Sequence, residues 1–162
     1  MRKLWAASVA TLMCLVLGGM PAVAQDRSGT DGPVLVSATQ ACAWAAPGDV
    51  LTGTCTYTAS DPRVTGPLTL TLVEHVGVPE GDDYVQTFDG SLPGPEGTWT
   101  GRYWVIFDQA TKTAWATSAL SGDGAYEGWT YVASGSDASM AGNQDLVGVL
   151  YQGSPPPGMT MR

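Results

Sequence analysis

Apolar and polar residues alternate along most of the chain with the period of a β-strand. In residues 67–76, for example, the leucines at 68, 70 and 72 share one face and the threonines between them share the other. No window shows a helical period over three turns. Turn-rich segments separate eight predicted strands, at residues 34–41, 50–58, 67–76, 83–88, 98–108, 112–120, 125–134 and 145–151. The pattern predicts an all-β fold.

The short connections predict an antiparallel meander. Residues 121–124 (SGDG) are typical of a hairpin turn, because Asp-Gly accepts the positive φ angles of a tight turn. A meander of eight strands hides its edges by closing into a single up-and-down β-barrel, with a β-sandwich as the alternative. The barrel domain is predicted at residues 34–152, after a flexible leader at 25–33 and before a disordered, proline-rich tail at 153–162.

Two segments share the pattern glycine, any residue, aromatic, any residue, glycine. They are residues 97–101 (GTWTG) and 124–128 (GAYEG). In a strand, each copy would put two glycines and a ring on one face. Glycine inside a strand indicates that a neighbouring group crowds the backbone or that the strand bends sharply, as closed barrels require. The pattern therefore favours the barrel, and it predicts that side chains added at Gly101 or Gly128 are not tolerated.

The N-terminal segment has the pattern of a secretory signal peptide. Arg2 and Lys3 precede an apolar run at residues 4–17, and the small residues 22–24 form a cleavage site before Gln25. We therefore predict a signal peptide at residues 1–24, secretion of the mature chain, and no membrane association after cleavage. A retained N-terminal anchor is the alternative.

Cleavage would leave two cysteines, Cys42 and Cys55, with a short turn-rich segment between them. In an oxidising compartment this arrangement predicts one disulfide, which would tie the first strand to the second. A metal site would need further ligands, and the one histidine is His75. Neither a metal site nor a cofactor is predicted.

The charge of the chain narrows the choice of partners. The net charge is −8, and loss of Arg2 and Lys3 would lower it by two further units. The remaining basic residues are scattered, so nucleic acid is excluded as a partner. The acidic residues are scattered too, and their spacing fits no EF-hand-type calcium loop.

No residue constellation predicts catalysis. His75 follows Glu74, but neighbours in a strand point to opposite faces and cannot form a dyad. The abundant aromatic residues can either line an apolar pocket or fill the core. Glu127 would be a polar anchor if its face is interior, and a solvated side chain if it is exterior. The predicted ligand-binding residues are Trp99, Tyr103, Trp115, Tyr126 and Glu127.

Residues 98–108 carry apolar bulk on both faces of a predicted strand. Trp99, Tyr103 and Phe107 share one face, whereas Trp104 and Ile106 lie on the other. A barrel buries only one face of each strand, and exposed apolar patches usually mark contact surfaces. This arrangement predicts a homo-oligomer held partly through Trp104 and Ile106.

Residues 121–128 (SGDGAYEG) resemble the glycine-rich strand of the allene oxide cyclase and dirigent barrels, where a glycine-rich turn leads into an aromatic residue and another glycine. The chain departs from that pattern at residues 129–131 (WTY), where small residues are expected. The mature region, including Cys55, residues 60–64 (SDPRV) and residues 97–102, also resembles small secreted bacterial proteins of unknown function. The resemblance implies an eight-stranded barrel with a partly apolar interior, and it carries over no catalytic residue.

These observations lead to a prediction of a secreted, non-enzymatic barrel that binds a small, mostly apolar molecule inside it. One alternative is a small barrel cyclase or isomerase that shapes an apolar substrate, as the resemblance implies. Another is a structural or adhesive module with exposed aromatic residues. The interior distinguishes them: a cavity is compatible with the first two, and a filled core with the third.

Overall fold

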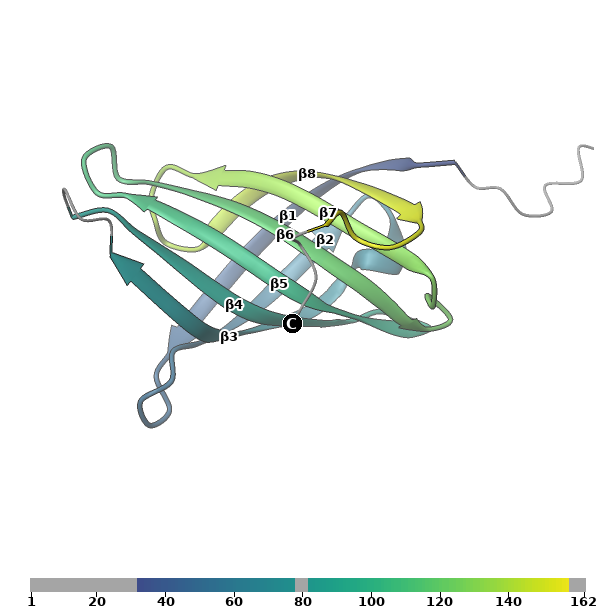
Figure 1. Cartoon of the computed structure of the whole chain (residues 1–162), viewed down its shortest axis with the longest axis horizontal. Coiled ribbons are helices and arrows are strands. Elements are labelled where there is room, and N and C mark those ends of the chain that lie inside the picture. The colour runs from purple at the N-terminus through teal and green to yellow at the C-terminus, as the bar shows by residue number, and fades with distance from the viewer. Residues whose placement is uncertain (1–31, 78–81, 158–162) are drawn as a thin grey trace, which may run out of the picture. The chain divides into compact units, whose positions relative to one another are not determined.

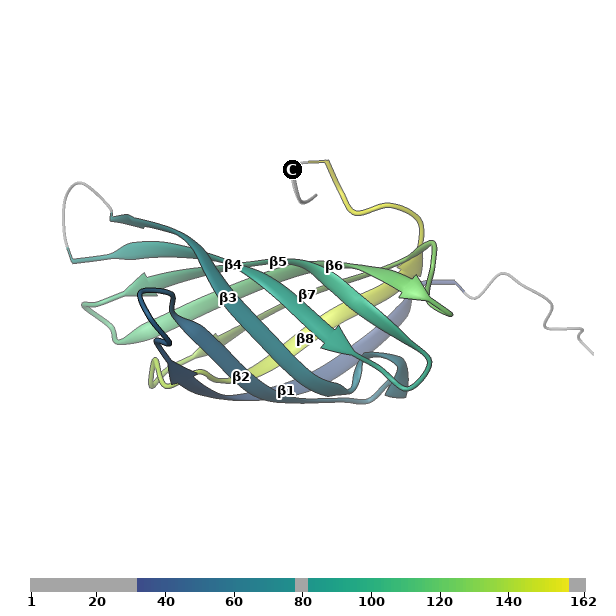
Figure 2. The same cartoon turned by 90° about the horizontal axis from the view of Figure 1, so that it is seen from below.

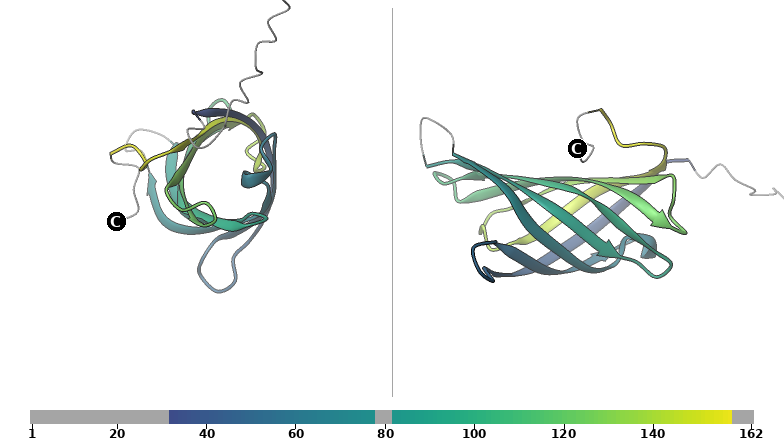
Figure 3. Two further views of the ribbon diagram at one scale, coloured as in Figure 1. Left: turned by 90° about the vertical axis from the view of Figure 1, so that its right-hand side faces the viewer. Right: turned by 60° about the horizontal axis from the view of Figure 1, so that its bottom comes forward.

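The computed structural model describes residues 32–77 and 82–157, which form eight strands and one short 3-10 helix. The elements are β1 (Val34–Ala45), β2 (Thr52–Ala59), η1 (Pro62–Val64), β3 (Gly66–Gly77), β4 (Tyr84–Pro93), β5 (Gly97–Asp108), β6 (Thr113–Gly124), β7 (Trp129–Asp137) and β8 (Asn143–Gln152). Each strand pairs antiparallel with the next, and β8 pairs with β1 (Figures 1 and 3). The predicted single up-and-down barrel is confirmed, and no sandwich forms.

The strand predicted at residues 125–134 begins four residues too early, because β7 starts at Trp129. Residues 125–128 form the turn between β6 and β7, where Tyr126 N donates to Asp123 O (3.4 Å) and Glu127 N donates to Gly124 O (3.2 Å). Gly124 and Gly128 adopt positive φ angles of 70° and 79°. The second glycine-aromatic pattern is therefore a turn. Its glycines are needed because the turn requires positive φ angles, and they do not serve to bend a strand. A β-carbon at Gly128 would meet no atom within 4 Å, so the crowding predicted there is wrong.

The first glycine-aromatic pattern does lie in a strand. In β5, Trp99, Tyr103 and Val105 point into the barrel and are buried. A β-carbon at Gly101 would collide with the backbone carbonyl of Ala119 on β6, so only glycine allows this close approach. The crowding predicted at Gly101 is confirmed. On β3, Leu68 and Leu70 are buried, as their alternation predicts.

The disulfide between Cys42 and Cys55 is also present. These residues lie directly opposite each other in the β1–β2 ladder, with their Cα atoms 4.0 Å apart. The bond ties β1 to β2 as predicted, and it is compatible with an extracellular protein.

The predicted signal peptide at 1–24 and nearly all of the predicted leader at 25–33 lie outside the described residues. Residues 153–157 contain no strand, and the rest of the predicted tail is also outside the described part. Within the described part of the chain, no helix has the length and apolar character needed to cross a membrane.

The strands run obliquely around the barrel, so their connections gather at two ends (Figures 1 and 2). The connections β2–β3, β4–β5 and β6–β7 lie at what we call the closed end, where η1 lies against the ring of strands (Figure 3). The connections β1–β2, β5–β6 and β7–β8 lie at the opposite, open end. We call the half of the barrel next to the closed end the closed half, and the half next to the open end the open half.

Candidate functional site

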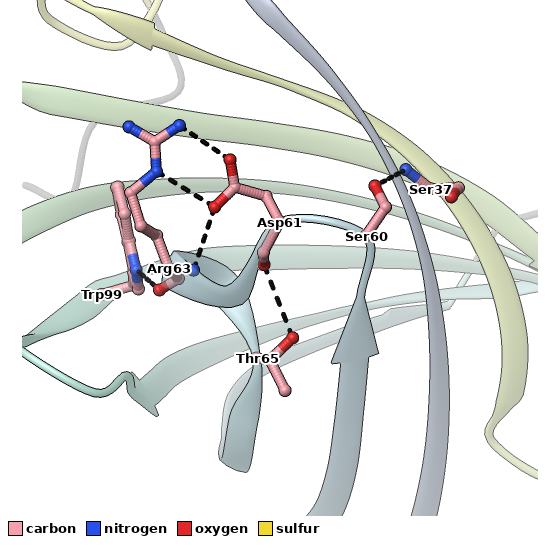
Figure 4. Close-up of polar contacts among 6 residues, drawn as sticks. All are labelled: Ser37, Ser60, Asp61, Arg63, Thr65 and Trp99. Carbon is pink, nitrogen blue, oxygen red and sulfur yellow. Dashed lines mark hydrogen bonds and ion pairs between the residues drawn. The ribbon is translucent and has the colours of Figure 1, made fainter.

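η1 and the residues around it close one end of the barrel, and Figure 4 shows polar contacts among these residues. Val64 of η1 is fully buried, and Trp99 Nε1 donates a hydrogen bond to Arg63 O (2.6 Å). Asp61 accepts from the Arg63 backbone N (3.0 Å), Nε (3.0 Å) and Nη2 (2.7 Å). These hydrogen bonds from Arg63 lower the pKa of the Asp61 carboxyl and hold it ionised. The helix is thus fixed to β5 across the end of the barrel.

Aromatic rings complete this closure. Trp99 stacks on Tyr126 with ring centroids 5.0 Å apart, and Tyr126 OH accepts a hydrogen bond from Glu96 N (3.1 Å). The Arg63 guanidinium lies 4.6 Å above the Trp129 ring, a cation–π contact. Trp99 and Tyr126, both predicted to bind a ligand, therefore lie among the residues that close the barrel.

The middle of the interior holds a pair of tyrosines. The hydroxyls of Tyr57 and Tyr131 are 2.9 Å apart and share a hydrogen bond, and both side chains are fully buried. Burial raises the pKa of both phenols, so they stay neutral. Because each hydroxyl has the other as its partner, this pair fills the core without leaving a polar atom unsatisfied.

The open half contains a cavity of about 190 Å³. Its walls come from every strand except β2, and from the β1–β2 and β7–β8 connections. The lining residues are Gln40, Trp44, Leu51, Leu70, Tyr84, Gln86, Phe88, Tyr103, Val105, Phe107, Ala114, Ala116, Asp137, Met140, Gly142 and Gln144. Aromatic and aliphatic side chains predominate, with a few polar groups, which is the usual composition of a small-molecule site.

Small side chains on β6 explain why this half is hollow. The inward positions of β6 carry Ala114 and Ala116 in the open half and Leu120 toward the closed end. On β4, Gly90 allows the Tyr103 ring to lie against the wall, since a β-carbon there would be 2.6 Å from Tyr103 Cε2. The cavity is thus encoded by residues that are too small to fill it.

Buried polar atoms without a partner gather in and near this cavity. They are Gln40 Oε1, Tyr103 OH, Ser118 Oγ and Gln144 Oε1, and each belongs to a side chain that is less than 8% exposed. Gln40 Nε2 donates to Cys42 Sγ (3.1 Å), which leaves its amide oxygen for another group. An unsatisfied buried polar atom costs about 1–3 kcal/mol, so these groups favour a molecule that hydrogen-bonds to them.

Tyr103 is the predicted ligand-binding residue that lines the cavity. Burial raises its pKa and Tyr131 adds to this, while the nearby Ser118 hydroxyl opposes it without reaching hydrogen-bond geometry. The side chain therefore presents a neutral hydroxyl, able to donate or accept.

Asp137 lines the cavity at the end of β7. Its Oδ1 accepts from Ser139 N (2.7 Å) and Ser139 Oγ (2.6 Å), and its Oδ2 accepts from Gly142 N (2.6 Å) and Asn143 N (3.1 Å). Burial opposes ionisation, but these four hydrogen bonds outweigh it and lower the pKa of the carboxyl. Asp137 is thus a preformed anion, only 4% exposed, that also shapes the β7–β8 turn.

A stack of rings forms part of the rim. His75 stacks on Tyr84 with centroids 4.8 Å apart, and Tyr84 stacks on Phe107 at 4.5 Å. His75 Nδ1 is 3.2 Å from Gln86 Nε2, so the hydrogen-bonding neighbour of this histidine comes from β4. At another point of the rim, Trp44 packs at a tilt against Phe88, with centroids 5.4 Å apart.

The remaining predicted ligand-binding residues lie away from the cavity. Trp115 is 45% exposed on the outer face of β6, and Glu127 is exposed in the β6–β7 turn, so the exterior alternative holds for Glu127. Sequence reasoning missed Gln40, Asp137 and Gln144. A signal for the glutamines was present, because each occupies an inward position next to buried apolar residues of its strand. Within residues 32–77 and 82–157, no group of three or more His, Cys, Asp or Glu could hold a metal ion.

The outer face of the open half carries an apolar row. Val76, Val85, Ile106 and Trp115 lie opposite one another on β3, β4, β5 and β6. Val76 and Ile106 are each 50% exposed, and Trp104 on β5 is half-buried nearby. The homo-oligomer expected through Trp104 and Ile106 stays a prediction, and this row extends the surface that would carry it.

Comparisons with known proteins identify no relative: no family model, curated protein or solved structure matches the chain. The resemblance to the allene oxide cyclase and dirigent barrels therefore stays a prediction.

Proposed function

We propose that this protein is a secreted binding protein that holds a small, mostly apolar molecule in the cavity of its open half. The observation that carries the proposal is the combination of aromatic walls with buried, unpartnered polar atoms in one cavity. Aromatic walls remove an apolar body from water, and a few polar groups orient it. Secretion is supported by the signal-peptide pattern at residues 1–24 and by the Cys42–Cys55 disulfide.

The size of the cavity limits the ligand. An engineered apolar cavity of about 150 Å³ binds benzene in another protein. At about 190 Å³, this cavity has room for one ring with a short substituent. Ligands with several fused rings would require the rim to move.

Binding of toluene and benzyl alcohol to the mature protein tests the proposal. Chemical-shift changes in NMR spectra and a rise in melting temperature should accompany binding, because a ligand of the folded state stabilises it. Native mass spectrometry of the purified protein should also detect a co-purified molecule of similar size. The proposal fails if none of these ring compounds binds and no molecule co-purifies.

A cavity-filling variant locates the binding. Ala116 lines the cavity and is 3% exposed, so Ala116→Leu should abolish toluene binding while the protein stays folded. Thr117→Leu is the matched control, because the next residue of β6 points outward and is only partly buried. Equal toluene binding by both variants would place the ligand elsewhere.

A further inference from the structure

We propose that the ligand of this cavity is a small organic cation, with a primary or secondary ammonium group on an apolar body about the size of one ring. This inference rests on the proposed binding function and specifies the chemical class of the ligand. It follows from the separation of the cavity into a polar wall and an aromatic wall, and from the charge of the polar wall.

The polar wall comes from three neighbouring strands. Gln40 on β1 and Gln144 on β8 are directly opposite each other in the strand ladder. Ser136 on β7 pairs with Asp145 on β8, which places Asp137 beside Gln144 at the end of that ladder. Two amides and one carboxylate therefore lie side by side on one side of the cavity, each less than 8% exposed.

This wall offers acceptors that lack donors. The amide oxygens of Gln40 and Gln144 have no hydrogen-bond partner among the described residues. The Asp137 carboxylate accepts only from uncharged groups of its own turn, and the ion pairs of the described part of the chain join Arg63 to Asp61 and Arg102 to Asp89. Among the residues that the structure describes, no lysine, arginine or histidine lines the cavity. An ammonium group supplies the N–H donors that the two amide oxygens lack and the positive charge that the Asp137 carboxylate lacks.

The aromatic wall lies on β4 and β5. Tyr84 and Phe88 come from β4, Tyr103 and Phe107 from β5, and Trp44 at the end of β1 packs against Phe88. The faces of such rings attract cations, and cages of aromatic residues are a known means of binding ammonium groups. An anionic ligand would instead meet the negative faces of the rings and the Asp137 carboxylate, with no cationic side chain in the lining to compensate.

The charges around the open end act in the same direction. Asp49 lies in the β1–β2 connection, Asp83 directly precedes β4, and Asp108 ends β5. Among the described residues, Lys112 in the β5–β6 connection is the one lysine or arginine at this end. A negative entrance raises the local concentration of cations and repels anions.

A series of ligands with one ring tests the charge preference. Benzylamine, benzyl alcohol, toluene and benzoate have similar shapes but differ in charge and in hydrogen-bond donors. Near neutral pH we expect benzylamine to bind about tenfold more tightly than benzyl alcohol or toluene, and benzoate to bind most weakly. If benzyl alcohol binds as tightly as benzylamine, or benzoate more tightly, the ammonium proposal is wrong while the proposed binding function stands. If no member binds, the ammonium proposal fails, and the proposed binding function fails with it unless another molecule co-purifies with the protein.

Variants of the polar wall test which side chains cause the preference for an ammonium ligand. Asp137→Asn removes the charge and should reduce benzylamine affinity about tenfold with little change for toluene. Asp145→Asn is the matched control, because Asp145 is exposed on β8 and carries the same charge outside the cavity. Equal losses in the two variants would show a general effect of surface charge and would overturn the proposal.

Asp137 also holds the β7–β8 turn, so Asp137→Asn can destabilise the fold. Gln144→Leu is the second variant, since it removes an acceptor that has no partner in the structure. It should reduce the selectivity for benzylamine over toluene severalfold and preserve stability. Unchanged selectivity for benzylamine over toluene in this variant would contradict the assigned role of the polar wall.

Discussion

The closed and open halves of this barrel are built from the same strands but carry different side chains at their inward positions. On β5, Trp99 fills the closed half, whereas Val105 faces the open half. On β6, Leu120 and Ala116 make the corresponding contrast. A few changes of side-chain volume along continuous strands are therefore enough to make one half a packed core and the other a cavity.

The halves also differ in how their polar atoms are satisfied. Outside the cavity, Tyr57 pairs with Tyr131 in the middle of the interior, and Trp99 Nε1 donates to the backbone of η1 in the closed half. In the open half, Gln40 and Gln144 each keep an amide oxygen without a partner. The comparison teaches that stability should depend mainly on the closed half, and ligand selectivity on the open half.

Removal of the largest buried ring should have the greatest effect. Trp99→Ala deletes a fully buried side chain and its hydrogen bond to Arg63 O, so we expect a loss of about 3–5 kcal/mol in the free energy of unfolding. Trp44→Ala is the counterpart in the open half, and it should cost much less because Trp44 is 38% exposed. Urea denaturation measures both. Equal losses would abolish the distinction between the halves.

Loss of the disulfide should have the second largest effect on stability. Replacing both Cys42 and Cys55 by alanine releases a loop with a sequence separation of 13, which should lower stability by about 3 kcal/mol. Thermal unfolding with and without reductant measures the effect, and the double variant serves as the control that reductant should not change. Two free thiols in the unreduced, unfolded wild-type protein would contradict the pairing.

Substitutions at two interior glycines test how much space for an added side chain each half of the barrel offers. A β-carbon at Gly148 would be 2.6 Å from the Tyr131 ring and 2.7 Å from Val132 O, in a packed region. At Gly90 it would be 2.6 Å from the Tyr103 ring, which can shift into the cavity. We expect Gly148→Ala to cost about 1–3 kcal/mol and Gly90→Ala less, with weaker toluene binding in the second variant. The opposite order of stability would show that the open half is the more rigid one.

The Asp61 carboxylate provides a prediction about pH. Its pKa is lower in the folded protein than in the unfolded chain because Arg63 donates to it. Its contribution is therefore present above the unfolded pKa of about 3.9 and is lost as the pH falls through the lower folded value. Asp61→Asn should cost about 1 kcal/mol near neutral pH and progressively less below pH ~4.

Denaturation of wild type and variant across this pH range tests the effect. Asp89→Asn is the control, because the Asp89 side chain is 50% exposed in its pair with Arg102 and should change stability little. A difference between wild type and Asp61→Asn that grows on acidification would contradict the expected sign.

The outer apolar row should contribute least to the stability of one chain. Ile106 is 50% exposed, so Ile106→Asp should change monomer stability by less than about 0.5 kcal/mol. If copies of the chain associate through this row, the variant should sediment as a smaller species than wild type at micromolar concentration. A wild-type protein that is monomeric under these conditions would refute the predicted oligomer.

The sequence alone determined the parts of this protein that depend on local pattern and on cysteine count. Alternation located all eight strands and separated the two faces of β5, and two cysteines after a signal-peptide pattern predicted the disulfide. The largest error in a strand start, at residues 125–128, arose because glycines at positive φ and glycines beneath a neighbouring ring look the same in a sequence.

Only the tertiary structure decided which inward residues meet. Alternation assigns a residue to the interior but not to a half of the barrel or to a partner across it. Trp99 and Tyr103 share a face and lie four residues apart, yet one joins the closure with Arg63 and the other lines the cavity. Gln40 and Gln144, separated by most of the chain, become neighbours because β8 closes onto β1. The candidate site depends on this ring closure, which brings distant strands together in a way that no local pattern records.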